Sequence, residues 1–224
     1  MTPITFNSAP PRLDPSLVGK LERVSFPTLG HYLEEGFVDP SLVRQAGSGR
    51  VVGRAVTVRT TATDSTMLHH AAGYLEPGDV LVIDTGGDRR HAPVGLVIAA
   101  TAAARGARGI VVDGVVTDVE EIAELGIPVY AYGRSMLTTK LHGIDAGGHH
   151  VAVSIGGVAV SSGDVVLADV NGVFIGAAAV LAQVIDVALQ DDAEEPALID
   201  RIRAGARLGE ETGATKALLD LRQE

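Results

Sequence analysis

Two patterns of apolar residues alternate along the middle of the chain. Buried strands are predicted by the apolar runs at 80–84, 110–113 and 128–131, and by the alternating segment at 55–58. Helices are predicted between these strands at 64–75, 93–105 (with Pro93 in the first turn) and 118–125. Repeated strand–helix–strand units are typical of a parallel sheet, so we expect an α/β protein.

The two ends of the chain have other patterns. Segment 1–15 has little periodicity and predicts an N-terminal arm, and residues 16–35 predict two short helices divided by Pro27. Short strands joined by glycine turns are predicted within 151–160, 165–168 and 173–175. Segment 177–224 predicts a helical tail for oligomer contacts, broken at Pro196, Gly205, Gly209 and Gly213. Because no linker or repeat interrupts the pattern, we expect a single domain over 1–224.

Composition narrows the class of protein. Asp plus Glu is 28 and Lys plus Arg is 18, which gives a net charge of 18 − 28 = −10. A chain this acidic repels nucleic acid and anionic membranes, so neither is an expected partner. The absence of cysteine excludes disulfides, thiolate nucleophiles and cysteine-ligated zinc. The N-terminus has no secretory signal and the apolar run at 173–185 is too short to span a bilayer, so we expect a cytoplasmic protein.

Two junctions between a strand and a helix are candidate sites. In the first, the glycine-rich segment 84–95 precedes a helix whose free amides near Gly95, Leu96 and Val97 favour an anion. Arg89 and Arg90 would add charge there. The competing interpretation, which the composition of the segment favours, is a surface loop with solvated charges.

The second junction is the segment 113–121. A carboxylate that follows a strand, such as Asp118, has the oxygen ligands that a divalent cation prefers. The competing interpretation is an ordinary helix cap, in which Thr117 or Asp118 begins the helix and Glu120 or Glu121 completes a capping box.

Other kinds of chemistry have little support. Four of the seven histidines occur as adjacent pairs, His69–His70 and His149–His150. Neighbours on a helix or strand point apart, which argues against a zinc site. The chain has no nucleophile elbow and no glycine-rich nucleotide motif.

The order of six motifs resembles the RraA-like family. The motifs are GRAVTVRT, DSTMLHHA, EPGDVLVIDTGG, APVGLVIAATAAARGARGIVVDGVVTD, ELGIPVYAYG and IGGVAVSSGDVVLADVNGVFI, and the resemblance runs from about 24 to 205. It implies a layered α/β/β swivelling-domain-like fold, assembled as trimers or dimers of trimers. The family includes regulators of ribonuclease activity and aldolases that act on 4-hydroxy-4-methyl-2-oxoglutarate.

The resemblance also implies a site shared between subunits. The family's metal-holding acid matches Asp118, and the amides that hold the substrate carboxylate match those at Leu96 and Val97. A C-terminal acid from the adjacent subunit matches Glu195 or, less closely, Glu194. The expected cofactor is Mg²⁺, with Mn²⁺ as an alternative.

Two positions depart from the aldolase pattern. Thr117 stands where the aldolases carry arginine, and Leu96 stands where they carry an acid. Loss of a charge-assisted bond of this kind costs roughly 1.5–3 kcal/mol. Arg89, Arg90 or Arg134 would have to supply the missing charge.

Three functions therefore remain open. The first is a metal-dependent lyase, an aldolase or decarboxylase that cleaves a C–C bond of a 2-oxo acid such as 4-hydroxy-4-methyl-2-oxoglutarate or oxaloacetate. The second is an enzyme on the same scaffold with a different substrate or reaction. The third is a non-catalytic regulator of a ribonuclease-like partner.

Overall fold

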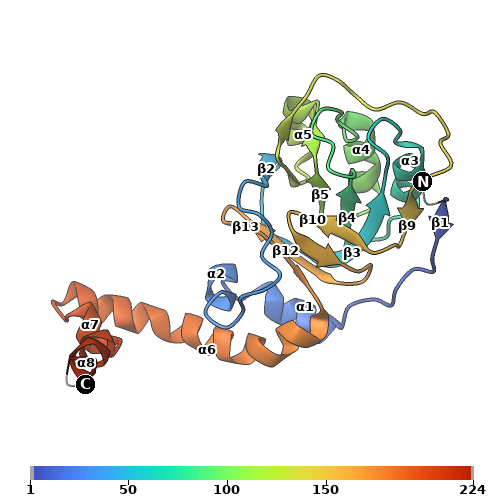
Figure 1. Cartoon of the computed structure of the whole chain (residues 1–224). Helices are drawn as coiled ribbons and strands as arrows, with labels where there is room; N and C mark the ends of the chain where they lie inside the picture. The colour runs from blue at the N-terminus through green and yellow to red at the C-terminus, as the bar shows by residue number, and fades with distance from the viewer. Residues whose placement is uncertain (1–2, 223–224) are drawn as a thin grey trace.

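A mixed nine-stranded sheet forms the centre of the computed structural model, which describes residues 3–222 (Figure 1). The first two residues of the predicted arm and the last two of the predicted tail lie outside this range. The path of the sheet is β1 (Thr5–Phe6), β9 (Gly148–His149), β3 (Val51–Arg59), β4 (Asp79–Asp84), β5 (Gly109–Asp113), β7 (Val129–Ala131) and β2 (Val43–Ala46). Strands β3, β4, β5 and β7 are parallel, as their apolar runs predict.

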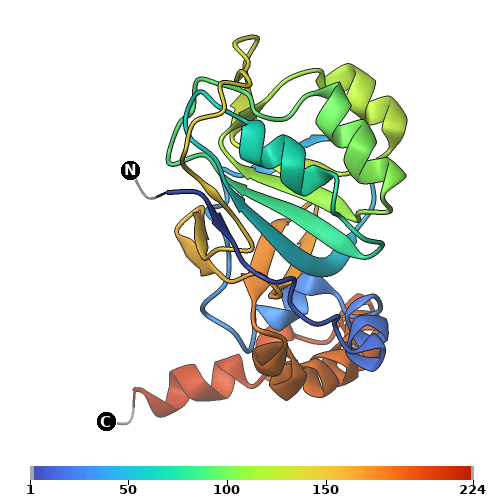
Figure 2. The same cartoon turned by 90° about the vertical axis from the view of Figure 1, so that its right-hand side faces the viewer.

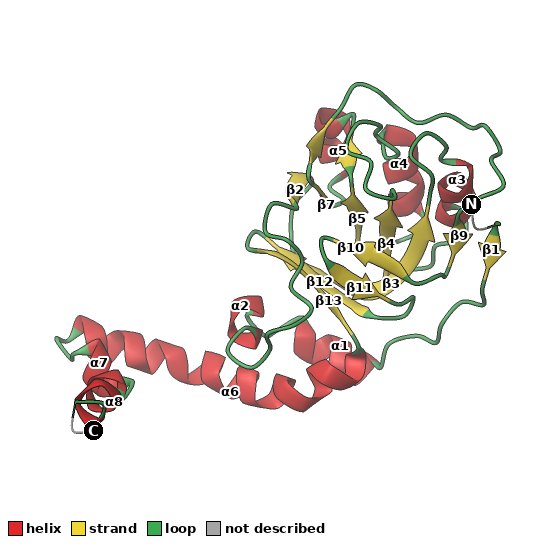
Figure 3. Cartoon of the chain, in the orientation of Figure 1, coloured by secondary structure: helices red, strands yellow, loops and turns green. Residues whose placement is uncertain are grey.

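The sheet has a different layer on each face. Helices α3 (Thr66–Ala72), α4 (Leu96–Ala104) and α5 (Val119–Leu125) cover one face, where Leu81 and Ile83 of β4 are buried. The hairpin β10 (Val153–Ile155) and β11 (Val158–Val160) lies on the other face, over Val80 and Val82. Successive residues of β4 therefore enter two different cores, since side chains alternate along a strand. The layered α/β/β fold is confirmed (Figure 3).

A third apolar cluster lies at the end of the molecule that carries the chain's long helix. The hairpin β12 (Val165–Asp169) and β13 (Gly172–Gly176) extends the sheet from β3. Helices α1 (Pro15–Leu21), α2 (Phe26–Leu29) and α6 (Ala178–Arg203) pack on it, and α6 leads to α7 (Leu208–Glu211) and α8 (Ala214–Asp220) (Figure 2). The predicted glycine turns are confirmed at both hairpins.

Several predicted boundaries are wrong. Helix α6 runs unbroken through Pro196, because a proline removes a single backbone hydrogen bond, which a long helix can lose. Helix α4 starts at Leu96, three residues after Pro93. Four short strands were not predicted: β2, β9, β6 (Val115–Val116) and β8 (Gly133–Arg134). They are too short to show a pattern, and two of the four residues of β2 are polar.

Within residues 3–222, the helices are all too short or too polar to cross a membrane.

Candidate active site

Asp118 lies at the junction between β6 and α5, in an unusual backbone conformation. Its φ angle of 53° is in the left-handed region, which non-glycine residues seldom adopt. This conformation brings its carboxylate to the first turn of α4. A Cβ atom at Gly95 would lie 2.5 Å from Asp118 Oδ2, so only glycine permits this approach.

The Asp118 carboxylate is held by two hydrogen bonds. The amide of Leu96 donates to Oδ2 at 2.9 Å, and the hydroxyl of Thr117 donates to Oδ1 at 3.1 Å. In the described chain Asp118 makes no side-chain hydrogen bond to the start of α5, so the capping-box interpretation is wrong. The left-handed backbone is the physical reason, because an N-cap needs extended backbone to reach its own amides.

A cavity of about 240 Å³ opens beside this carboxylate. We call it the Asp118 cavity. Its lining residues are Ser65, His69, Ala92, Pro93, Gly95, Leu96, Val97, Ile98, Thr117, Asp118, Thr138, Thr139, Lys140 and Leu141. Four residues predicted for the site, namely Gly95, Leu96, Val97 and Thr117, therefore line one cavity together with Asp118.

Lys140 supplies a positive charge to this cavity that the sequence analysis did not identify. Its Nζ donates to the carbonyl oxygen of Thr138 at 3.0 Å and to the hydroxyl of the same residue at 3.2 Å. The backbone of Lys140 is fixed on both sides, because its amide donates to Thr63 and its carbonyl accepts from Ser65. The ammonium group has three N–H donors, so one remains for an anion after the two bonds to Thr138.

Asp64 fixes the segment that follows Lys140. Its carboxylate accepts hydrogen bonds from the amides of His142 and Ile144 and from Thr66. Burial opposes ionisation of this group, but these hydrogen bonds together hold the pKa of Asp64 below its ordinary value. Asp64 is therefore ionised at pH 7, and its hydrogen bonds hold the segment that follows Lys140 in place.

The three predicted arginines lie elsewhere. Arg89 stacks on the ring of Tyr132, with 3.2 Å between Cζ and the ring centroid, and its guanidinium lies 3.8 Å from Asp113. Arg90 is exposed in the glycine-rich turn, and Arg134 donates to Gln45 at 3.2 Å. The Asp118 cavity is lined by other residues, so the prediction that one of these arginines replaces the family arginine lacks support from the geometry.

The glycine-rich segment closes on itself. Asp88 accepts from the amides of Arg90 and His91, and Thr85 donates to the carbonyl oxygen of Asp88. The acids that end β4 and β5 hold the β10–β11 hairpin, since Asp84 and Asp113 accept from the amides of Ser154 and Gly156. Residues 84–91 thus form a structural turn, and only the helix start beyond them belongs to the cavity.

Glu195 lies far along α6, at the other end of the molecule from α4 and α5 (Figure 1). It lines a separate hollow with Arg23 and Arg50. The neighbouring Glu194 accepts from Gln190 at 2.9 Å. Neither acid can join Asp118 of the same chain, so their predicted role requires a second copy.

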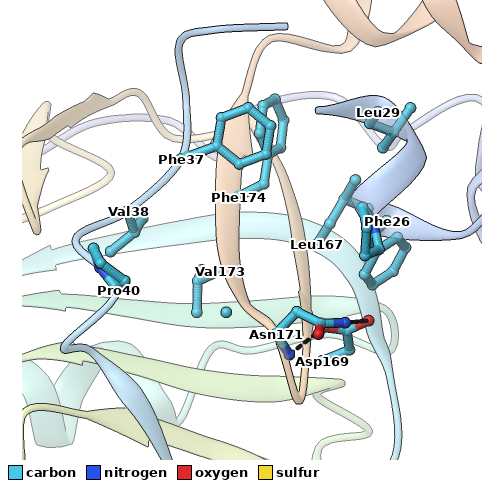
Figure 4. Close-up of a pocket in the computed structure, with 12 residues that line it drawn as sticks. Phe26, Leu29, Phe37, Val38, Pro40, Leu167, Asp169, Asn171, Val173 and Phe174 are labelled. Atoms are coloured by element: carbon cyan, nitrogen blue, oxygen red, sulfur yellow. Dashed lines mark hydrogen bonds between the residues drawn. The ribbon is translucent and has the colours of Figure 1, made fainter. Parts of the chain in front are cut away.

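A second cavity, larger than the Asp118 cavity, has a different character. It encloses about 500 Å³ between α2, the segment 37–40 and the β12–β13 hairpin, and its walls include Phe26, Phe37 and Phe174 (Figure 4). Its polar groups are Asp169 and Asn171, which bond to each other at the hairpin turn. An apolar cavity with one paired acid offers few groups for acid–base chemistry.

Comparisons with known proteins agree with the geometry. The family model described as RraA-like, Aldolase/RraA, matches residues 29–175. This chain belongs to the RraA-like family. The resemblance predicted from the order of the motifs is therefore confirmed.

Proteins similar to this chain have different names. A protein of Halalkalibacterium halodurans named "Putative 4-hydroxy-4-methyl-2-oxoglutarate aldolase" is 33% identical over 159 residues, which are 69% of this chain and 75% of that protein. Among solved structures, RraAS2 of Streptomyces coelicolor, described as an unusual member of the RNase ES inhibitor RraA family, is 26% identical with a TM-score of 0.71 and covers 85% of this chain and 98% of its own. An uncharacterised protein of Pseudomonas syringae pv. tomato shares the fold at a TM-score of 0.76 and 21% identity, over 93% of this chain and 99% of its own.

A divalent metal ion is expected from the family resemblance, and the donor set can be tested against it. Among the described residues, no three acids or histidines are close enough together to hold a metal ion. Asp118 alone offers the two lone-pair directions that Leu96 and Thr117 leave open. One carboxylate suits Mg²⁺ that keeps most of its waters, so the residues fit a weakly anchored ion.

Proposed function

We propose that the chain is a metal-dependent lyase that cleaves a C–C bond of a 2-oxo acid in the Asp118 cavity. The observation that carries this proposal is the Asp118 carboxylate, which opens into a cavity beside Lys140 instead of capping its own helix. Membership of a family that includes proteins named as aldolases supports the reaction class.

The residues of the cavity suit a substrate with a carboxylate next to a keto group. The amides of Val97 and Ile98 lie in the first turn of α4, where amide groups lack helical partners and the helix dipole favours an anion. Lys140 also lines the cavity, and its ammonium group adds a positive charge. These groups would bind the carboxylate and orient the keto oxygen toward Asp118.

Cleavage of 4-hydroxy-4-methyl-2-oxoglutarate breaks the bond between C3 and C4. The hydroxyl group on C4 would lose its proton to water and become the keto group of one pyruvate. The electron pair of the broken bond would pass to the enolate of the other pyruvate, which then takes up a proton from water at C3. A bound divalent cation supplies a Lewis acid for the keto oxygen. Lys140 would stabilise the negative charge that develops on the enolate. In the family's aldolases, an arginine at the position of Thr117 would have this role.

A second copy of the chain would complete the site. Val97 is 69% exposed and Leu141 is 63% exposed, so apolar side chains surround the mouth of the cavity. The family resemblance implies that a neighbouring copy covers them and brings its Glu195 to Asp118. We therefore propose a homo-oligomer, a trimer or a dimer of trimers, with the site between subunits.

The direct test is release of pyruvate from 4-hydroxy-4-methyl-2-oxoglutarate and from oxaloacetate, with added Mg²⁺ or Mn²⁺. We expect turnover above a blank that contains the metal alone. In Asp118→Asn the turnover should fall by at least about 100-fold, because the cation loses its anchor. Glu124→Gln, which changes an exposed acid on α5, is the matched control and should retain full activity.

Absence of turnover with either substrate would contradict the aldolase and decarboxylase assignment. Turnover confined to other 2-oxo acids would instead favour an enzyme of different specificity, as the uncharged Thr117 and Leu96 suggest. Full activity in Asp118→Asn would move the site to another part of the molecule.

A regulatory function is the second candidate. Two observations favour it: the similarity to solved structures named as inhibitors of RNA processing, and the net charge of −10, which suits a basic partner. The test is inhibition of a purified RNase ES-type ribonuclease by the chain. Inhibition that persists in Asp118→Asn would separate this function from the lyase.

A further inference from the structure

Three histidine rings meet beneath the N-terminal segment of the chain. His149 of β9 stacks on His150, with 4.0 Å between ring centroids and 20° between ring planes. His70 of α3 meets His149 edge-on at 5.9 Å. The ring of Phe6 lies edge-on to His70 at 5.1 Å, so the N-terminal segment covers one side of this histidine cluster.

The N-terminal segment is attached mainly through the backbone of β9. Thr5 donates to Gly147 at 3.2 Å, and Asn7 donates to His149 at 3.1 Å. The side chain of Asn7 adds a bond to the carbonyl oxygen of His150 at 2.9 Å. In the register of the β1–β9 pair, Phe6 stands directly opposite His149. The backbone of His149 and His150, together with Gly147, therefore holds the N-terminal segment.

His149 is poorly placed to carry a charge. It is 6% exposed, and its Nε2 has no hydrogen-bond partner among the described residues. Burial, followed by the neighbouring rings of His150 and His70, lowers the pKa of His149 to about 4. Burial also lowers the pKa of His150, which has a strained left-handed backbone with φ of 56°.

We propose that residues 4–7 form a pH-controlled latch, which lies on β9 while His149 and His150 are uncharged and detaches when they bind protons. Two imidazolium rings stacked at 4.0 Å repel each other. Detachment of Phe6 opens His149 to water, which stabilises its charged form. Release of the latch would also leave the edge of β9 unpaired, where another strand can bind.

The charged groups around the cluster do not offset this repulsion. The buried Arg54 of β3 bonds to Asp79 at 2.9 Å and to Glu76 at 3.2 Å, and Glu76 also pairs with Arg12. The nearby carboxylates are thus already paired with guanidinium groups. The remaining titratable groups that face the cluster or the latch are Tyr74 of α3 and Asp145, which accepts from the amide of Ile4.

The direction of the pH effect follows from proton binding. The attached latch holds the histidines in the form with fewer protons, so the detached form gains protons as the pH falls. The attachment constant is at its full value above about pH 6.5, the ordinary pKa of histidine. Below that pH it falls by up to about tenfold per unit for each proton taken up, until the pH reaches the lowered pKa of His149.

The chain contains no tryptophan, so Phe6→Trp places a single fluorescent reporter on the latch. Phe6 is 57% exposed, which leaves room for the larger ring. We expect the anisotropy of this reporter in the full-length chain to fall reversibly between about pH 6.5 and 4, while the far-ultraviolet circular dichroism stays constant. Constant anisotropy over that range, or a fall that occurs only together with unfolding, overturns the proposal.

Two further variants assign the transition to the cluster. His150→Asn tolerates the left-handed backbone and cannot bind a proton, and His149→Gln removes the buried ring. In the reporter background, either variant should make the transition shallower and move it to lower pH. His31→Asn, at an exposed histidine on another part of the surface, is the control and should leave the transition unchanged. An unchanged transition in His150→Asn overturns the proposal even if His149→Gln does not fold.

Discussion

At the scale of single residues, the site depends on which groups Asp118 contacts. Its left-handed backbone and the absence of a side chain at Gly95 turn the carboxylate away from its own helix and toward α4. The sequence left a helix cap and a cation ligand both open and favoured the cap, because both roles use an acid just before a helix. It could not identify Lys140, which lies in an aperiodic segment and enters the cavity through backbone bonds to residues more than seventy positions earlier.

Lys140 is the residue whose replacement best tests the charge of the cavity. Lys140→Met keeps the aliphatic stem of an exposed side chain and removes its charge. A charge-assisted bond of roughly 1.5–3 kcal/mol predicts a loss of roughly 10- to 150-fold in kcat/KM for the 2-oxo acid. Steady-state kinetics would measure this loss. Lys216→Met, at an exposed lysine of α8, should have no effect, and equal kinetics in both variants would contradict the assignment.

At the scale of elements, apolar runs predicted the parallel strands β4, β5 and β7, because burial on both faces removes polar residues from them, and an alternating segment predicted β3. The pattern could not predict β9, which consists of Gly148 and His149, or β1, which pairs with it. Both are stabilised by partners that are distant in sequence. Helix α6 shows another limit of the local pattern. The low helix propensity of Pro196 predicted a break, but the helix continues through it.

The turn after β2 is a second place where close packing decides the structure. Gly47 and Gly49 both have positive φ angles, of 72° and 92°. A Cβ atom at Gly47 would lie 2.1 Å from the carbonyl oxygen of Ile127, whereas one at Gly49 would meet open space.

We expect Gly49→Ala to lower the free energy of unfolding by about 1 kcal/mol, which is the cost of the left-handed backbone alone. Gly47→Ala should lower it by about 2–5 kcal/mol, because overpacking against the backbone is added. Urea unfolding of both variants measures the difference. Equal losses would show that the contact with Ile127 relaxes without cost.

At the scale of the whole molecule, the apolar side chains of the C-terminal tail support the proposed homo-oligomer. Helix α6 has 26 residues, and its buried side chains are Leu181, Ile185 and Ala188, all in its first half. Helix α8 has seven residues; its Leu218 and Leu219 and the C-cap residue Leu221 are exposed. A helix this short is marginal in water unless its apolar side chains are covered. The tail is thus suited to contact a second copy.

A mixing experiment tests whether the tail completes a neighbouring site. Asp118→Asn and Glu195→Gln should each be inactive as pure proteins. When the two variants are unfolded and refolded together in equal amounts, about a quarter of the sites should combine an intact Asp118 with an intact Glu195 from another copy. Recovery of pyruvate release measures this combination. If the mixture stays inactive while each pure variant assembles normally, Glu195 has no part in a shared site.

Strand β4 places Val80 and Val82 in one core and Leu81 and Ile83 in the other. Gain or loss of one residue within β4 would move each of these side chains to the opposite face of the sheet. Leucine and isoleucine would then be forced into space that fits valine, and the smaller valines would leave voids beneath the helices. Length changes among descendants of this gene should therefore accumulate in connections such as 85–93, whose glycines meet open space, and not in the strand itself.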